Sequence, residues 1–345
     1  MSADPLSADT GRFPTGVDAP LPALHVEHLP GTPADALADA LADPRTLAVL
    51  GFGSQAARHD DPRALVVPLE PLGSAPLEVW RARGPVAHGR DGAVRWAADD
   101  ALLFGAIEIG EAAAGGILAA AEQAYQALHA SLERHRFPYP LRIWNYLDAI
   151  TEGDGDLERY RQFCVGRARG LGSFDVDRLP AATAIGCRDG RRVLQVYWLA
   201  GRTPGTPLEN PRQLSAYRYP RQYGPQSPSF ARAMLPAAGS EMPLLLSGTA
   251  SVVGHETRHA GDLSAQLDET FANFHSLLGE AHRRRPDLPR GFGPGSRLKV
   301  YLPDADAVAS VEAALGRLAP GAPRVLLQAD ICRRDLHVEV DGVHS

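Results

Sequence analysis

The sequence predicts an α/β (α+β) fold of mixed sheets, each with helices packed on one face. The first observation is the order strand, strand, strand, helix, strand, helix, strand, strand, which starts near residue 77. The second is the return of the same order in residues 211–345. Strands that alternate with helices of these lengths favour sheets covered by helices.

The N-terminal part predicts an arm and a small unit. The first twenty residues are rich in Pro, Gly, Ser and Asp and are typical of a loose arm. Residues 47–53 (LAVLGFG) and 64–70 (ALVVPLE) predict strands, and an Ala/Asp-rich segment near residues 34–43 predicts a helix.

The central part carries the first copy of the pattern. EVWRARG and GAVRWA predict a pair of strands across a Gly-Arg-Asp-Gly turn, and ALLFGAIEIG predicts the next strand. A helix is expected from its apolar positions, and LRIWNYL, a helix at about residues 156–170, ATAIGC and RRVLQVYWLA follow. The apolar positions are Ile117, Ala121, Ala124, Leu128 and Leu132.

The C-terminal part repeats this order. SFARAML and PLLLSGTASVV predict strands, and Asp262 is placed to cap a helix that carries Leu263, Leu267, Phe271, Phe274 and Leu278 on one face. RLKVYL predicts a strand, Asp304 caps a second helix, and RVLLQADIC and LHVEV close the unit. ALLFGAIEIGE and PLLLSGTASVV take equivalent positions in the repeated order, as do RIWNYL and RLKVYL, so we expect an internal duplication.

Composition and charge exclude several classes of function. A chain of 345 residues is long enough for two or three compact units. Its net charge of −6 and the lack of a basic stripe argue against a nucleic-acid or anionic-membrane partner. Only one of the 35 cationic residues is a lysine, so a site for an anionic substrate has to be built from arginine.

The cysteines and the N-terminus indicate the compartment. The three cysteines (Cys164, Cys187 and Cys332) are far apart and form no C-x-x-C pair, so neither a disulfide framework nor a zinc ribbon is expected. The N-terminal segment lacks the features of a signal peptide, and no apolar run approaches the length of a membrane span. We therefore expect a cytoplasmic protein.

The segment from His255 to His259 (HETRH) matches the sequence pattern of the zinc-protease motif. That chemistry needs both histidines one turn apart on a continuous helix. Here a strand and Gly254 precede the motif, and the capping Asp262 follows it, so the helix is expected to begin after the motif. We predict a loop of hydrogen-bonding polar residues and no metal site. Serine-hydrolase, Walker and dinucleotide-binding fingerprints do not occur in the sequence.

The last predicted strand, LHVEV, places Leu336, Val338 and Val340 on one face. His337 and Glu339 fall on the other face. A single glutamate at such a position is more often solvated or ion-paired than catalytic, and the cysteine at 332 is by itself a small core residue.

Five stretches of the sequence together resemble the chorismatase family, enzymes that cleave chorismate with release of pyruvate. They are RIWNYLDAI, YRQFCVGRARGL, YRYPRQYGPQSPSFARA, LLSGTASVVGHETRHAGD and QADICRRDLHVEVDG. The resemblance runs from about residue 77 to the C-terminus, and the last 110 residues also resemble the RidA/YjgF fold.

The resemblance implies three RidA/YjgF-like units with pseudo-threefold symmetry in one chain. We place the units at residues 1–76 (arm and small unit), 77–210 (central domain) and 211–345 (C-terminal domain). The family has its active site in the cleft between the central and last units. The implied protein is a monomer without cofactor that acts on a small molecule.

The resemblance also assigns residues to roles. The family's catalytic glutamate falls on Glu339, and a buried carboxylic acid that stays protonated near neutral pH is suited to protonate the methylene carbon of an enol ether. The two carboxylates of chorismate call for arginine forks and tyrosine hydroxyls. Tyr160, Cys164 and Arg167 fall on one helix face by their spacing, and Tyr219, Tyr223 and Arg232 lie in the family motif before the last unit. For each of these, surface exposure or ordinary packing is the alternative.

Three positions separate the branches of the family. They read here as Gln213, Gly248 and Cys332, where the hydrolytic branch carries Val, Ala and Ala. This resemblance implies the branch that forms 3-hydroxybenzoate by internal displacement through an arene oxide, with Cys332 assisting aromatisation.

Three alternatives remain open from the sequence. The first is a hydrolytic chorismatase that forms 3,4-dihydroxycyclohexa-1,5-dienoate. The second is a RidA-type imine hydrolase, because Arg324 stands fifteen residues before Glu339. The third is a ligand-binding protein without catalytic activity.

Overall fold

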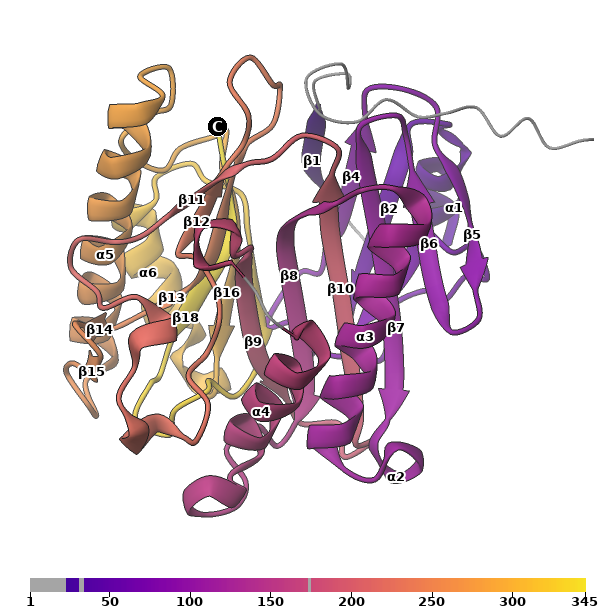
Figure 1. Cartoon of the computed structure of the whole chain (residues 1–345). Coiled ribbons are helices and arrows are strands. Elements are labelled where there is room, and N and C mark those ends of the chain that lie inside the picture. The colour runs from indigo at the N-terminus through magenta and orange to yellow at the C-terminus, as the bar shows by residue number, and fades with distance from the viewer. Residues whose placement is uncertain (1–22, 31–33, 173–174) are drawn as a thin grey trace, which may run out of the picture.

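Three large β-sheets, each with its own helices, follow one another along the described part of the chain (Figure 1). The computed structural model describes residues 23–30, 34–172 and 175–345, so the N-terminal arm expected for the first twenty residues lies outside the described residues. The mixed sheets with helices on one face confirm the predicted fold class. Within the described ranges, none of the helices has the length and apolar character to cross a bilayer.

The first sheet has four strands in the order β1-β4-β2-β3, of which β2 and β3 are parallel. Its elements are β1 (Leu24–Leu29), α1 (Ala34–Ala42), β2 (Thr46–Phe52), β3 (Ala64–Val67) and β4 (Leu77–Ala82). The predicted helix and two strands of this part are confirmed, whereas β1 was not predicted.

The central sheet has six strands in the order β5-β6-β7-β10-β8-β9. Its strands are β5 (Ala87–Asp91), β6 (Val94–Ala98), β7 (Leu102–Gly110), β8 (Tyr139–Asp148), β9 (Ala181–Cys187) and β10 (Val193–Gly201). Its helices are α2 (Glu111–Ala114), α3 (Ile117–His135) and α4 (Arg159–Leu171). The apolar positions predicted for α3 are buried against the sheet, as their helical spacing requires.

The third sheet repeats that strand order as β11-β12-β13-β18-β16-β17. Its strands are β11 (Thr206–Leu208), β12 (Ala233–Leu235), β13 (Leu244–Ala250), β16 (Arg297–Leu302), β17 (Arg324–Gln328) and β18 (Glu339–His344). Its helices are α5 (Leu263–Arg284), capped by the Asp262 side chain as predicted, and α6 (Val308–Leu318). A two-stranded hairpin, β14 (Val252–Val253) and β15 (Glu256–Thr257), precedes α5.

The central and third sheets also agree in strand direction. In each, one parallel pair lies at one edge (β8 with β9, β16 with β17), and the pairs along the rest of the sheet are antiparallel. The first sheet corresponds to the last four strands of this arrangement. Since it has four strands where the others have six, the pseudo-threefold symmetry stays an expectation, and the domain borders at 76/77 and 210/211 stay predictions.

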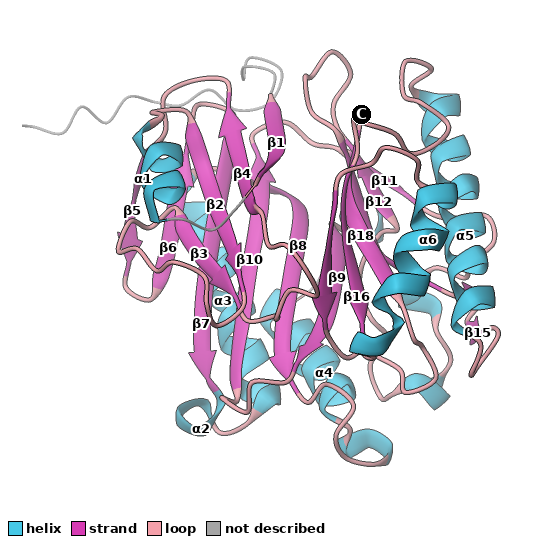
Figure 2. Cartoon of the chain, turned by 180° about the vertical axis from the view of Figure 1, so that it is seen from behind, coloured by secondary structure: helices cyan, strands magenta, loops and turns pink. Residues whose placement is uncertain are grey.

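The helices cover one face of each sheet, and the other faces meet in a shared core (Figure 2). This shared core takes side chains from all three sheets, among them Trp80, Trp144, Tyr197 and Tyr301. Each sheet has in addition a separate core against its own helices. The edge where β9 faces β13 is therefore enclosed by both units, and a cavity lies there.

Two buried ion pairs connect the sheets at the shared core. Lys299 Nζ, on β16, lies 3.0 Å from Glu78 on β4, and Arg142 Nη2, on β8, lies 3.0 Å from Asp341 on β18. The lysine charge and burial act in opposite directions on Glu78, and the net effect lowers its pKa to about 2. Breaking such a pair leaves an uncompensated charge inside the protein, so both pairs fix the relative position of the sheets.

The structure corrects three predicted strands. EVWRARG does not pair with GAVRWA: its strand, β4, lies between β1 and β2 of the first sheet, and β5 is the partner of β6. LHVEV becomes a strand only from Glu339, with Leu336 buried just before it. β17 ends at Gln328, so Cys332 lies in the loop between β17 and β18. Alternating apolar residues marked these segments as extended, but pairing depends on contacts that are distant in the sequence.

Candidate active site

All nine residues predicted for the site line one cavity of about 720 Å³ between the central and third units. They are Tyr160, Arg167, Gln213, Tyr219, Tyr223, Arg232, Gly248, Cys332 and Glu339. The walls come from α4, β9, β13, the segment before β12 and the loop between β17 and β18. Their roles in binding or catalysis stay predictions, but the side chains do meet in one place.

Glu339 occupies the first position of β18, opposite Ala250 of β13 and Tyr301 of β16. It is 5% exposed and borders the cavity. Burial is the largest cause that raises the pKa of Glu339, to about 8, and the negative charge of Asp341 adds to it. Arg142, Arg232 and Arg333 act in the opposite direction. The carboxyl group is therefore protonated at neutral pH and able to donate a proton.

A buried polar network lies behind Glu339. Asp341 Oδ2 accepts hydrogen bonds from Arg142 Nη2 (3.0 Å), Thr183 Oγ1 (2.7 Å) and the Tyr301 hydroxyl (3.0 Å). Thr183 Oγ1 in turn accepts from the backbone N–H of Gly248 at 2.9 Å. Because these groups come from β8, β9, β13, β16 and β18, the network holds the central and third sheets together directly below the acid.

Two buried arginines present part of their guanidinium groups to the cavity. Arg232 donates to the Leu214 carbonyl oxygen at 2.8 Å and to the Tyr219 hydroxyl at 2.9 Å. Arg167, on α4, donates to the Ser229 carbonyl oxygen at 2.6 Å. Both are 4% exposed, and the Nε of each is buried without a hydrogen-bond partner within the described residues. Fixed guanidinium groups with donors to spare suit the binding of carboxylates.

Arg333 is a cavity residue that the sequence analysis did not single out. Its guanidinium group lies 4.2 Å from the ring centre of Tyr223 and 5.4 Å from that of Tyr219. It also donates to the His255 carbonyl oxygen at 2.9 Å. Its place directly after Cys332 in the motif ADICRR is the signal that could have identified it.

Cys332 and Tyr160 form an apolar side of the cavity. Burial is the main cause that raises the pKa of the Cys332 thiol, and the nearby Glu339 carboxylate raises it further. The pKa of Tyr160 is raised by burial as well, to well above its usual value. Both groups are therefore protonated and can serve as neutral hydrogen-bond donors. A thiol held in this form is not a nucleophile.

The HETRH segment contributes to the cavity wall and does not form a helix. Glu256 and Thr257 line the cavity from β15, and α5 starts only at Leu263, as predicted. His255 Nδ1 lies 3.3 Å from the Tyr223 hydroxyl, and His259 Nε2 lies 3.2 Å from Glu269. Gln213, opposite Gly254, donates to the Val252 carbonyl oxygen at 3.1 Å. Each histidine thus has a structural partner.

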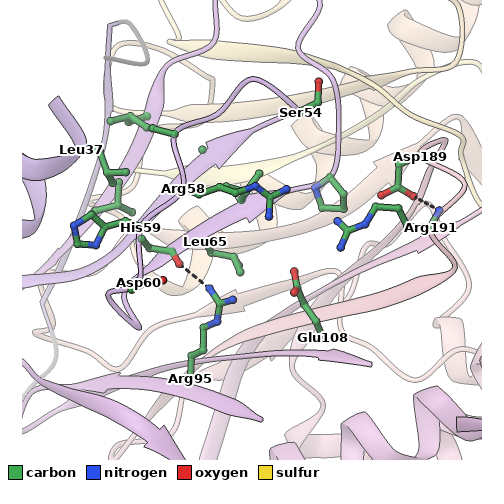
Figure 3. A pocket seen from close by; sticks show the side chains of 18 of the residues that line it. Leu37, Ser54, Arg58, His59, Asp60, Leu65, Arg95, Glu108, Asp189 and Arg191 are labelled. Carbon is green, nitrogen blue, oxygen red and sulfur yellow. Dashed lines mark hydrogen bonds between the residues drawn. The ribbon is translucent and has the colours of Figure 1, made fainter. Parts of the chain in front are cut away.

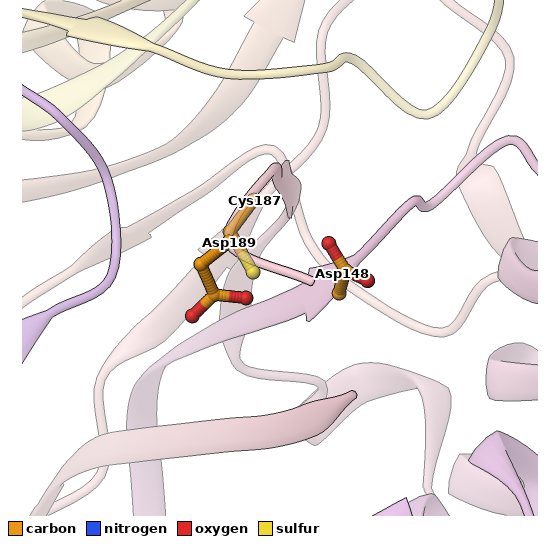
Figure 4. A group of neighbouring side chains, drawn as sticks. All are labelled: Asp148, Cys187 and Asp189. Atoms are coloured by element: carbon orange, nitrogen blue, oxygen red, sulfur yellow. The ribbon is translucent and has the colours of Figure 1, made fainter. Parts of the chain in front are cut away.

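One group of side chains in the described part of the chain has metal-ligand spacing, and it lies outside this cavity (Figure 4). It consists of Asp148, Cys187 and Asp189. Burial raises the pKa of the Cys187 thiol to about 12, and Arg192 lies 3.2 Å from Asp148. A protonated thiol and a carboxylate paired with arginine are poor metal ligands.

Arg324, the residue on which the imine-hydrolase alternative depends, lies away from the cavity wall. It stands on β17 and forms an ion pair with Glu312 of α6. The arginines that line the cavity are others, among them Arg167, Arg232 and Arg333, so the main support for that alternative is lost.

A buried carboxylic acid surrounded by arginines and tyrosines is an arrangement that suits a small anionic molecule and a general acid. A family model described as chorismatase FkbO/Hyg5-like, N-terminal, matches residues 78–200. A protein of Streptomyces hygroscopicus described as a chorismatase is 37% identical over 313 residues, which cover 86% of this chain and 89% of that protein. Another, described as a 3-hydroxybenzoate synthase, is 34% identical over 296 residues, which cover 83% and 86% of the two chains.

The fold agrees with these similarities. A crystal structure of a chorismatase superposes with a TM-score of 0.81 and 31% identity, covering 96% of this chain and all of that one. The chain therefore belongs to the chorismatase family.

Proposed function

We propose that this protein cleaves chorismate to 3-hydroxybenzoate and pyruvate. The observation that carries the proposal is the Glu339 carboxyl group, buried in an arginine-lined cavity with its pKa raised to about 8. An enol ether reacts with acid by protonation of its methylene carbon, and this step needs a carboxylic acid that still holds its proton near neutral pH.

The arginines account for recognition. Chorismate carries two carboxylates, and Arg167, Arg232 and Arg333 reach the cavity from three different segments. Arg232 is held by Leu214 and Tyr219, so it meets a carboxylate without first losing side-chain freedom. The phenol rings beside Arg333 keep its guanidinium plane in position.

Glu339 starts the reaction. Its proton goes to the methylene carbon of the enolpyruvyl group, and the ring hydroxyl next to the ether displaces that group. The carbon–oxygen bond to the ring breaks as the new one forms, pyruvate leaves, and the hydroxyl proton restores the acid. The arene oxide then opens and aromatises to 3-hydroxybenzoate. The reaction consumes no water. Because water at the reacting carbon would give the hydrolytic product instead, the internal route needs a cavity that keeps water away from that carbon.

The preference for this branch rests on three cavity residues. Gln213, Gly248 and Cys332 all line the cavity that Glu339 borders. The thiol of Cys332 is held in its protonated form and can donate to the epoxide oxygen as it opens. The relative described as a 3-hydroxybenzoate synthase adds support, whereas relatives described as chorismatases leave the product open.

The test is incubation with chorismate in D₂O, with ring product and pyruvate followed by NMR and mass spectrometry. We expect equal amounts of 3-hydroxybenzoate and pyruvate, and one solvent deuteron in the methyl group of pyruvate. A dihydroxycyclohexadienoate in place of 3-hydroxybenzoate would assign the protein to the hydrolytic branch. Binding of chorismate without pyruvate release would overturn the enzymatic proposal.

A further inference from the structure

A second cavity, of about 520 Å³, lies between the first and central sheets (Figure 3). Its walls come from β2, β3, β6, β7, the segment after β2 and the turn between β9 and β10. Four of these wall segments have a counterpart around the active-site cavity. By its place in the sheet, β3 corresponds to β9, β6 to the segment just before β12, and β7 to β13. The β9–β10 turn corresponds to the β17–β18 loop. The two cavities are thus formed by equivalent segments of successive units.

Strand register identifies the counterpart of Glu339 in the central sheet. Glu339 pairs with Tyr301 on one side and with Ala250 on the other. Gln195 pairs with Tyr146 on one side and with Glu108 on the other. Tyr146 and Tyr301 are the same position of the matching strands RIWNYL and RLKVYL. Gln195 therefore occupies the place of the acid, and Glu108 that of Ala250.

The same register gives Arg232 a counterpart. Trp198 stands three residues after Gln195; it pairs with Gly105, which pairs with Trp96. Gly342 stands three residues after Glu339; it pairs with Leu246, which pairs with Ala233. Arg95 and Arg232 are the residues directly before Trp96 and Ala233. The second cavity therefore has an arginine where the active site has its tyrosine-bound arginine. The amide at the position of the acid, Gln195, is buried next to Glu108 and does not line the cavity.

The arginines of this cavity form no direct ion pair in the described part of the chain, although Glu108 and Asp60 act on the charge of Arg95 at longer range. Arg58, Arg90, Arg95 and Arg191 all line it, and none of them forms an ion pair with a residue in the described ranges. Arg95 is half-buried and donates to the Ala64 carbonyl oxygen at 3.0 Å. Burial is the largest cause that lowers the pKa of Arg95, and the neighbouring Arg90 and Arg58 add to it, whereas Glu108 and Asp60 act in the opposite direction. Because the net effect lowers the pKa, a bound anion would stabilise this charge.

Four acidic residues also line the cavity, Asp60, Glu70, Glu108 and Asp189, and the last three accept hydrogen bonds from neighbouring groups. Glu108 accepts a hydrogen bond from Gln195 at 2.8 Å, and Glu70 accepts one from the Ser54 backbone N–H at 2.7 Å. The floor is apolar and includes Leu37, Leu65 and Leu77. Arginines at the rim and leucines at the floor suit a molecule with one charged end and one apolar end.

We propose that this cavity is a second ligand site, which binds a small carboxylate with an apolar ring and does not turn it over. The carboxylate would meet Arg95 and Arg191, and the ring would lie on the leucine floor. Gln195 has no acidic proton to donate, and its amide nitrogen donates to Glu108 and to the Val66 carbonyl oxygen. The proposal of this second site holds whichever ring product the active site forms.

The test is calorimetric titration with benzoate of the wild-type protein and of three arginine variants. Arg95→Met should weaken benzoate binding at one site at least tenfold, and Arg191→Met should weaken it several-fold. Arg134→Met, an exposed arginine on α3 outside the cavity, should bind as the wild type does. Arg191 is exposed and its variant does not disturb the backbone contact of Arg95, so it keeps the test decisive if Arg95→Met unfolds.

Arg232→Met separates the two cavities, because it affects only benzoate bound in the active site. Loss of benzoate binding in Arg95→Met or Arg191→Met together with retention in Arg232→Met would support the second site. The proposal is overturned if benzoate does not bind, or if all of its binding is lost in Arg232→Met and unchanged in Arg95→Met and Arg191→Met.

Discussion

Gly248 lies so close to the Glu339 carboxyl group that a methyl group does not fit between them. A Cβ atom at residue 248 would stand 1.9 Å from Glu339 Oε1 and 2.9 Å from the carboxyl carbon. It would also stand 3.3 Å from the methyl group of Thr183. Because Thr183 belongs to the buried network around Asp341, the flexible carboxyl group is the part that has to move. Residue 248 therefore determines where the acid stands.

Gly248→Ala should redirect the reaction and not abolish it. The displaced carboxyl group still reaches the enolpyruvyl methylene, but the ring is seated differently, and a shift of about 1 Å is enough to change the preferred path when competing barriers differ by a few kcal/mol. We expect part of the product to become the non-aromatic diol, and more of it when Gln213→Val is added. Chromatography with mass detection gives the ratio.

Gly110→Ala is the matched control, since a Cβ there has no neighbour within 4 Å. It should leave both rate and product unchanged. Product from Gly248→Ala that is entirely 3-hydroxybenzoate, at the wild-type rate, would mean that residue 248 is not a selector.

Cys332→Ala should slow aromatisation while pyruvate release continues. The thiol is protonated and lies in the same cavity as Glu339, so its removal takes away a donor to the epoxide oxygen without touching the acid. General acid assistance is typically worth about 10²–10⁴-fold, and the diverted material should appear as the diol. Cys164→Ala, on the neighbouring helix α4, serves as the control. Equal ring products from wild type and Cys332→Ala would remove the thiol from the mechanism.

Turnover should decrease as pH rises through about 8. Burial and Asp341 raise the pKa of Glu339 to about 8, and only the protonated form can transfer a proton to carbon. The dependence of kcat/KM on pH reports the ionisation of the free enzyme. Measured from pH 5 to pH 10, it should therefore fall with one ionisation near pH 8. A profile that stays level to pH 10 would contradict a Glu339 acid.

Stability should depend on pH through the same group. The folded pKa of Glu339, about 8, lies above the usual value of 4.5 for a glutamate side chain, so the folded protein holds a proton that the unfolded chain loses. The contribution is fully present below pH 4.5 and is lost as pH rises through 8, with a slope of at most about 1.4 kcal/mol per pH unit. Urea unfolding at several pH values should show Glu339→Gln gaining stability relative to wild type from pH 5 to pH 9. A constant difference would mean that Glu339 is not perturbed.

The sequence carried more information on the site than on strand pairing. The resemblance to the family led to nine residues that line the cavity, because these residues stand in short local segments: on α4, before β12, on β13, and at or just before β18. Arg142 and Asp341 could not be paired from the sequence, because their contact joins β8 and β18 across 199 residues. β4 was placed with the wrong partner for the same reason: alternation marks a strand and its buried face, but the choice of neighbour depends on tertiary packing.

The central claim is that Glu339 delivers the proton, and the rate of pyruvate release from chorismate by Glu339→Gln tests it most directly. The glutamine keeps the shape and the hydrogen-bonding capacity but has no proton to give. Glu256→Gln is the matched control, since Glu256 lines the same cavity but is exposed and paired with Arg258. We predict a loss of at least about 10²–10⁴-fold in Glu339→Gln, with chorismate binding retained, and little change in Glu256→Gln. A folded Glu339→Gln protein that releases pyruvate within about tenfold of the wild-type rate would contradict the claim.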